Sequence, residues 1–153
     1  MTPRMTLAAA GLVACAVCHA QQNPAARPPG DVTPLAGTWN GAHLEQRSGC
    51  INASSNGFHG TYSGYIFRLE ANRGLNMDEI AVTGLTCNYA GQYRDDAARW
   101  IWSGTLSCSD GRAGTFESQS IFALTQLMSL RLSIRLTGTE SCAIDAILSG
   151  ARF

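Results

Sequence analysis

The sequence predicts an all-β fold, an antiparallel meander of about eight short strands that closes into a barrel and carries two disulfides. Two observations lead to this prediction. Apolar residues recur at every second position in several segments, and no window shows a comparable helical stripe. Tight-turn signals also separate these segments. Because a meander must either pair its edge strands or cover them, a β-sandwich is the alternative to the barrel.

Residues 1–20 have the layout of a bacterial export signal. Arg4 supplies a positive start, and an almost uncharged apolar run follows from Met5 to Val17. That run is shorter than a membrane-spanning helix requires. Leu12-Val13-Ala14-Cys15 resembles the lipobox of bacterial lipoproteins, so Cys15 is an alternative site of lipidation. We expect export to the periplasm or the extracellular space, with a membrane anchor only if Cys15 is lipidated.

We expect residues 21–34 to form a proline-rich tether and residues 35–153 to form the barrel domain. The tether holds four of the five prolines, and the domain holds none. Proline removes a hydrogen bond from a β-ladder, so a sheet of well-paired strands is compatible with this distribution.

The clearest strand is 128–136, in which apolar and polar residues alternate strictly. Its apolar face holds Met128, Leu130, Leu132, Ile134 and Leu136. The same alternation recurs at Tyr65, Phe67 and Leu69; at Leu85, Cys87, Tyr89 and Tyr93; at Trp100, Trp102, Leu106 and Cys108; and at Cys142, Ile144, Ala146 and Leu148. In segment 116–124, the residues that fit one strand face are Phe116, Phe122 and Leu124.

Turns are predicted where residues that tolerate positive φ angles gather between the apolar segments. The turn segments are Asn56-Gly57, Asn72-Arg73-Gly74, Asp95-Asp96-Ala97-Ala98 and Asp110-Gly111. The acidic pairs Asp78-Glu79 and Asp95-Asp96 are both expected in turns. Glycines within strands are expected to let the sheet bend rather than to leave space inside the barrel.

The segment Leu35-Ala36-Gly37-Thr38-Trp39 contains a Gly-x-Trp motif at the start of the domain. This motif resembles the first strand of lipocalin and avidin-type barrels. With Cys50 after the Trp, the segment also looks like the opening of small periplasmic inhibitors of secreted metalloproteases. Each resemblance implies a small secreted β-barrel of the calycin kind, and each covers only this short segment.

Cleavage after Ala20 leaves four cysteines, an even number that suits complete pairing in an oxidising compartment. Folding the chain about Ala97-Ala98 places Cys87 opposite Cys108 on adjoining strands. The second bond then joins Cys50, near the first strand, to Cys142 in the last.

Charge and composition exclude several classes of function. The formal net charge is zero, so nothing favours a nucleic-acid backbone. All eleven basic residues are arginines. Without lysine, Schiff-base chemistry and pyridoxal phosphate attachment are excluded.

No catalytic set, metal site or cofactor is predicted. After the signal only His43 and His59 remain as histidines, and we expect both at the surface or the rim. A metal site that combines them with Glu45 or Glu70 across adjacent strands is disfavoured, because nothing in their spacing requires one.

We expect a non-enzymatic binding or interaction protein whose partner is a small ligand or an envelope protein. A barrel that holds a ligand predicts an open mouth lined by Trp39, Tyr65 and Trp102. The first alternative is a protease-inhibitor-like periplasmic module with a packed interior. The second is a small secreted hydrolase, in which His43 or His59 would lie within hydrogen-bond reach of a carboxylate in a pocket.

Overall fold

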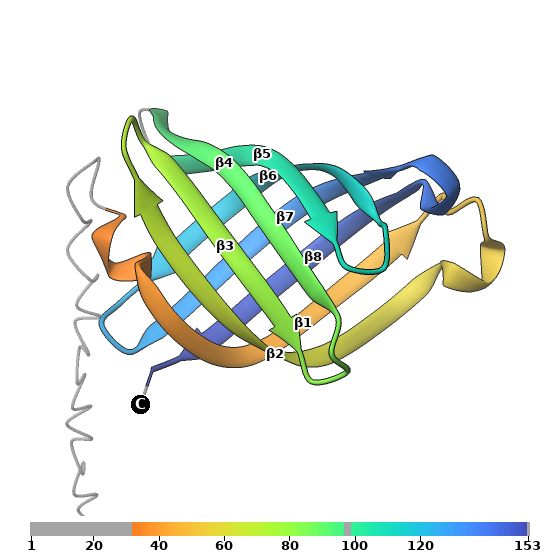
Figure 1. Ribbon diagram of the computed structural model, residues 1–153, viewed down its shortest axis with the longest axis horizontal. Helices are drawn as coiled ribbons and strands as arrows, with labels where there is room; N and C mark the ends of the chain where they lie inside the picture. The colour runs from red at the N-terminus through yellow and green to blue at the C-terminus, as the bar shows by residue number, and fades with distance from the viewer. Residues whose placement is uncertain (1–31, 97–98, 153) are drawn as a thin grey trace, which may run out of the picture.

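The computed structural model describes residues 32–96 and 99–152, which form a closed barrel of eight antiparallel strands (Figure 1). The export signal predicted at 1–20 and the lipidation candidate Cys15 lie outside the described residues. No helix in the described part of the chain is long and apolar enough to cross a membrane. The strands are β1 (Gly37–Ser48), β2 (Gly57–Glu70), β3 (Gly74–Ala81), β4 (Thr86–Asp96), β5 (Arg99–Cys108), β6 (Ala113–Ala123), β7 (Leu127–Thr137) and β8 (Cys142–Ala151).

The predicted meander barrel is confirmed. Each strand pairs with the next along the chain, and β1 pairs with β8 to close the barrel, with Asn40 opposite Ala151 and Ser48 opposite Ala143. Closure gives every strand two hydrogen-bonded neighbours, which removes the exposed edges of an open sheet.

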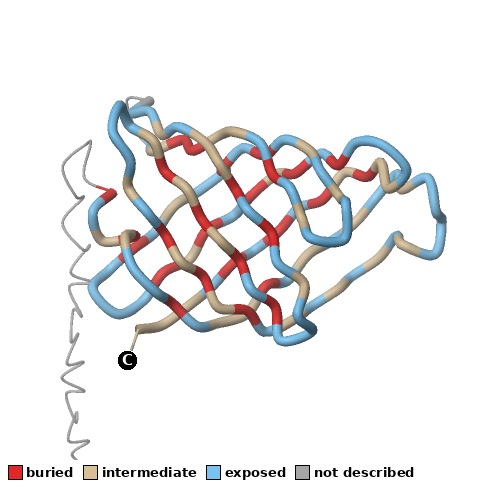
Figure 2. The backbone as a smooth tube through the Cα atoms, viewed as in Figure 1, coloured by how far each residue is buried: buried red, intermediate tan, exposed pale blue. Residues whose placement is uncertain are grey.

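Burial alternates along the strands, as Figure 2 shows. In β7, all five residues of the predicted apolar face are buried, whereas Arg131 and Arg135 between them are exposed. This confirms that period-two spacing identifies the face that packs inside the barrel.

The prediction for β6 is wrong in part. Phe116 is buried, but Phe122 and Leu124 are 47% and 41% exposed. The register of β6 against β7 shifts between Ser118 and Ser120. Because a bulge inserts an extra residue, it turns every later side chain to the opposite face.

The acidic pair Asp78-Glu79 was expected in a turn, but it lies within β3, and Glu79 is buried. The turn comes earlier, between β2 and β3. There Asn72 and Arg73 adopt positive φ angles of 56° and 63°, which suit a tight hairpin. Because residues two apart in a strand share one face, Glu79 falls on the same inward face as Met77.

One end of the barrel is closed by the N-terminal segment of the domain. The 3₁₀ turn η1 (Thr33–Leu35) lies at this end, and Val32 and Leu35 are buried in the core. The folded domain therefore includes residues 32–34, which the sequence assigns to the tether. Trp39 Nε1 donates to the carbonyl of Leu35 at 2.8 Å, which fixes the turn over the barrel.

Large aromatic side chains fill this closed half. The rings of Trp102 and Phe116 meet edge to face with centroids 4.4 Å apart, and Tyr89 packs against Phe116 at 5.4 Å. Gly91 and Gly104 face each other on β4 and β5, and a Cβ on Gly104 would lie 2.0 Å from the carbonyl oxygen of Ala90. The absence of a side chain at these two positions therefore allows the close backbone approach between β4 and β5.

Both predicted disulfides are present, Cys50–Cys142 and Cys87–Cys108. Cys87 lies opposite Cys108 in the register of β4 and β5, which is the pairing expected from folding about Ala97-Ala98. The other bond ties the segment after β1 to the start of β8. Two disulfides indicate an oxidising compartment, which is typical of proteins outside the cytoplasm.

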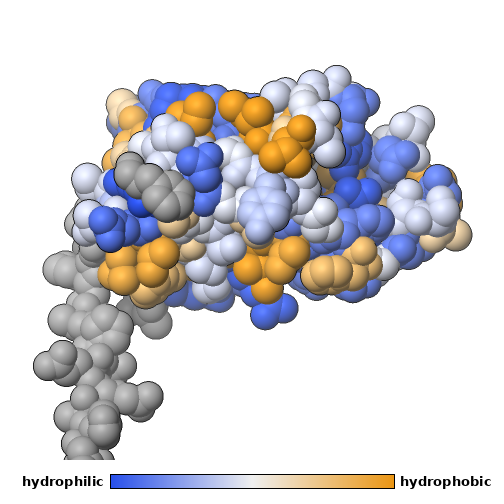
Figure 3. All heavy atoms as spheres, turned by 90° about the horizontal axis from the view of Figure 1, so that it is seen from below, coloured by the Kyte–Doolittle hydropathy of each residue, from blue (hydrophilic) through white to orange (hydrophobic). Residues whose placement is uncertain are grey.

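The outer surface carries several exposed apolar side chains on β1, β2, β3 and β8. Figure 3, seen from below, shows apolar groups as separate patches divided by polar ones. The exposed apolar residues of these four strands are Leu44, Phe58, Tyr62, Ile80 and Ile147.

Candidate functional site

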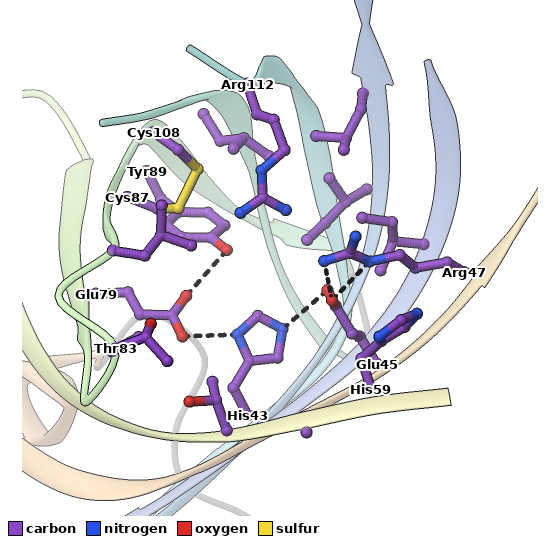
Figure 4. A pocket seen from close by; sticks show the side chains of 18 residues that line it. His43, Glu45, Arg47, His59, Glu79, Thr83, Cys87, Tyr89, Cys108 and Arg112 are labelled. Carbon is purple, nitrogen blue, oxygen red and sulfur yellow. Dashed lines mark hydrogen bonds and ion pairs between the residues drawn. A yellow bond between two sulfur atoms is a disulfide. The ribbon is translucent and has the colours of Figure 1, made fainter. Parts of the chain in front are cut away.

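A cavity of about 220 Å³ occupies the end of the barrel opposite η1. Its lining comes from the ends of β1, β3, β5 and β7 and from the starts of β2, β4 and β8, together with the connections between these strands (Figure 4). The barrel is thus divided along its axis into a packed half and a half with room for a ligand.

His43 of β1 is the most deeply buried basic side chain that lines the cavity. Its Nδ1 lies 2.6 Å from Glu79 Oε1, a hydrogen bond that crosses the intervening strand β2. His43 and Glu79 are only 8% and 4% exposed. The expected rim position of His43 is therefore corrected, because Trp39, Gly41 and His43 share one parity along β1 and this parity faces inward.

The Glu79 carboxylate is surrounded by donors from three other strands. Its Oε1 also accepts from the Ser63 hydroxyl at 2.8 Å, and its Oε2 accepts from the Tyr89 hydroxyl at 3.2 Å. Burial and the nearby charge of Glu79 raise the pKa of Tyr89 well above its ordinary value, so Tyr89 remains a donor. Glu79 has few acceptor positions left for a ligand.

Glu45 forms the second carboxylate of the cavity and lies two residues beyond His43 on the same face. Its Oε2 lies 3.5 Å from His43 Nε2, and Arg47 Nε donates to its Oε1 at 2.7 Å. Burial would raise the pKa of Glu45, but the hydrogen bonds and charges of His43 and Arg47 outweigh it and lower the pKa to about 2. Glu45 is ionised at neutral pH.

The charge of His43 follows from the same contacts. Burial alone would lower its pKa, but Glu45 and Glu79 raise it to about 9. At neutral pH His43 is therefore an imidazolium with no lone pair to accept a proton. Its Nε2 faces the Glu45 carboxylate at 3.5 Å and is shielded from solvent, so both ring nitrogens of His43 are directed at carboxylates.

The opposite wall of the cavity is apolar. Leu106, Ile134, Leu136 and Ile144 line it from β5, β7 and β8, and the Cys87–Cys108 disulfide borders it. A polar wall on β1 to β3 thus faces an apolar wall on β5, β7 and β8. A molecule held between them needs one polar and one apolar side.

Arg112 and His59 stand at the rim. Arg112 follows the Asp110-Gly111 turn, and its Nε donates to Asp110 Oδ2 at 2.7 Å. Its guanidinium points into the cavity in Figure 4. His59 lies at the start of β2, where its Nε2 contacts the carbonyl oxygen of Ser55 at 3.1 Å, so the rim position expected for it agrees with the structure.

The residues expected to line a mouth lie in the packed half instead. Trp39, Tyr65 and Trp102 are each 0% exposed, and none of them lines the cavity. Trp39 is sealed beneath η1, and Trp102 Nε1 donates to the carbonyl of Leu75 at 2.8 Å. The Tyr65 hydroxyl is buried without a hydrogen-bond partner among the described residues.

The arrangement does not match the metal site considered from the sequence. Glu70 ends β2, whereas His59 lies near the start of that strand, so these two residues are separated along the barrel. Within residues 32–96 and 99–152, no group of three or more His, Cys, Asp or Glu residues is arranged to hold a metal ion.

Glu79, Tyr89 and Arg112 were not predicted as site residues from the sequence. The sequence did contain a signal for the site residues of β1. Odd-numbered positions along this strand share one face, and these include Trp39, His43, Glu45 and Arg47. Polar residues on this face appear solvent-exposed unless the barrel is known to contain a polar cavity. No comparable signal marked Glu79, whose strand was not recognised.

Comparison with known proteins adds no relative to this description. No protein-family model matches the chain, and neither a curated protein nor a solved structure matches it.

Proposed function

We propose that this protein is an exported, non-enzymatic binding protein that holds a small molecule in the cavity at the open end of its barrel. The observation that carries the proposal is the cavity of about 220 Å³ at one end of an otherwise packed barrel, with His43, Glu45 and Glu79 held in its wall. A concave site with a few fixed polar groups among apolar side chains is the usual form of a small-molecule site.

The division of the cavity into two walls supports the same proposal. Polar groups on β1 to β3 would orient the ligand, and the apolar wall on β5, β7 and β8 would gain from burial of its body. The protease-inhibitor-like alternative expects a packed interior, and the open half of the barrel has room that this alternative does not need.

The hydrolase alternative has one observation in its favour, the 2.6 Å contact between His43 and Glu79 in a pocket. The chemistry favours binding nonetheless. A general base needs a free lone pair near the working pH, and His43 is protonated below about pH 9. Its two nitrogens also face two carboxylates rather than a hydroxyl or a thiol.

Export is part of the proposal and rests on the predicted signal at 1–20 together with the two disulfides. Intact mass spectrometry of the mature protein tests it. A chain that begins at Gln21 and lacks four hydrogens agrees with the soluble, doubly bonded form. An added lipid mass on Cys15 would show the anchored form instead.

Native mass spectrometry of protein purified from the cells that naturally produce it tests ligand binding. We expect an additional mass on the wild type that dissociates on collisional activation. Ala81→Phe should abolish this mass because Ala81 is buried and lines the cavity. Ala90→Phe is the matched control, since it adds the same ring on β4 at a residue that does not line the cavity. Bare polypeptide from the wild type would count against the proposal.

A further inference from the structure

We propose that the ligand is a compact molecule with an anionic carboxylate head bound by Arg112 at the mouth and an apolar body against the apolar wall of β5, β7 and β8. This inference rests on the proposed binding function and names the chemical class of its ligand. It follows from which charges in the cavity already have partners, how Arg112 is held, and how much room remains.

The two carboxylates of the cavity already have their partners. Glu45 pairs with Arg47 and His43, and Glu79 accepts from His43, Ser63 and Tyr89. A cationic ligand would have to displace one of these fixed donors before it gained a carboxylate. The cavity is therefore poorly suited to an amine.

The two arginines of the cavity differ in how many partners they have. Arg47 donates to Glu45 through its Nε and pairs with it through its Nη2. Arg112 pairs only through Nε with Asp110, and no other carboxylate of the described residues pairs with its guanidinium. Because the Arg112 side chain is only 16% exposed and points inward, its Nη edge is directed at the cavity (Figure 4).

The turn before β6 holds Arg112 in this position. The Asp110 carboxylate accepts from the backbone N of Arg112 at 3.2 Å and from its Nε at 2.7 Å. The Arg112 carbonyl in turn accepts from the backbone N of Cys108 at 2.8 Å, beside the disulfide. A guanidinium fixed in this way presents two parallel N–H groups, which match the two oxygens of a carboxylate.

The size and the wall of the cavity restrict the rest of the ligand. A cavity of about 220 Å³ favours a compact ligand with a single ring or a short chain. Leu106, Ile134 and Ile144 offer an apolar surface that suits a single ring or a short branched chain. Phenylpropionate has this size and polarity and serves as the probe.

Isothermal titration calorimetry of the full mature protein with phenylpropionate, phenylpropanol and phenylpropylamine tests the inference. These probes share one body and differ in the head group. We expect the acid to bind about tenfold to hundredfold more tightly than the alcohol, the range for one charge-assisted contact, and the amine to bind most weakly.

Arg112→Gln should remove the preference for the acid and leave the affinity for the alcohol within about twofold. Arg112→Lys keeps the charge but lacks the two parallel N–H groups of a guanidinium, so it should give an intermediate preference for the acid. Arg131→Gln is the matched control, because Arg131 is an exposed arginine on β7 that does not line the cavity. It should behave as the wild type does.

The outcomes separate this inference from the proposed function. If the alcohol or the amine binds as well as the acid, or if Arg112→Gln leaves the preference intact, the carboxylate assignment is overturned and binding in the cavity stands. If none of the three binds, the inference is overturned. The mass added to the wild type and lost in Ala81→Phe then decides the proposed function independently.

Discussion

His43 Nδ1 and Glu79 Oε1 lie 2.6 Å apart although their strands, β1 and β3, are not neighbours in the barrel. The bond spans β2, whose Ser63 hydroxyl donates to the same oxygen at 2.8 Å. With the Tyr89 hydroxyl of β4 on its other oxygen, this one buried carboxylate joins four strands at the boundary between the packed half and the cavity. Its partners hold the polar wall in position before any ligand arrives.

A double-mutant cycle measures this coupling. We expect His43→Gln and Glu79→Gln each to lower the free energy of unfolding by about 3 kcal/mol, because each removes one charge from a buried ion pair. The double variant should lose clearly less than the sum of the single losses. Urea denaturation followed by tryptophan fluorescence gives the values. Additive losses would show that the two side chains act independently.

The pH dependence of stability follows from the raised pKa of His43 and the lowered pKa of Glu45. His43 has a raised pKa of about 9 against an ordinary value of 6.5, so its contribution is complete below pH 6.5 and is lost as the pH rises through 9. Glu45 has a lowered pKa of about 2 against 4.5, so its contribution is complete above pH 4.5 and is lost as the pH falls towards 2. The two together predict greatest stability between pH 4.5 and 6.5.

Thermal unfolding of the wild type and His43→Gln at a series of pH values above 6.5 checks the loss of the His43 contribution. The wild type should lose about 3 kcal/mol relative to the variant between about pH 6 and about pH 10. The variant keeps every other titrating group and serves as the baseline. Parallel curves for the two proteins would mean that His43 is not charged in the folded barrel at neutral pH.

The sequence was sufficient for the architecture because the closed half obeys the simple rule of apolar residues inside. Leu130, Leu132 and Ile134 alternate with polar residues, and that spacing alone predicts β7. The register of β4 and β5 follows from folding about residues 97 and 98, so the Cys87–Cys108 bond was predictable as well.

The site was not predictable because the same rule reverses on the polar wall of the open half. On β1, His43 and Glu45 face inward, whereas the apolar Leu44 is 39% exposed. An alternation pattern gives the two faces of a strand but not which of them faces a polar cavity. The bond between His43 and Glu79 also depends on the stagger of non-adjacent strands, which local spacing does not encode.

The two disulfides should differ in their contribution to stability. The Cys50–Cys142 bond closes a sequence separation of 92 residues, and Cys87–Cys108 closes one of 21. In the chain-entropy model these correspond to about 4–5 and about 3 kcal/mol. Paired Cys→Ala variants should therefore rank in this order in urea denaturation. An equal or reversed order would mean that native contacts of the alanine variants, rather than loop closure, dominate the difference.

Arg152 should stabilise the closed end of the barrel through contacts that lysine cannot reproduce. Its guanidinium lies 3.9 Å from the ring centroid of Trp39, and its Nη2 donates to the carbonyls of Pro34, at 2.7 Å, and Ala36. Arg152→Met removes both kinds of contact and should cost about 2 kcal/mol. Arg152→Lys keeps the charge over the ring but cannot reach several carbonyls with one planar group. Its stability should therefore lie between those of the wild type and Arg152→Met. Denaturation curves should give this ranking, with Arg131→Met as a control near the wild type. If Arg152→Met unfolds at the wild-type midpoint, η1 is held by Val32, Leu35 and the Trp39 hydrogen bond alone.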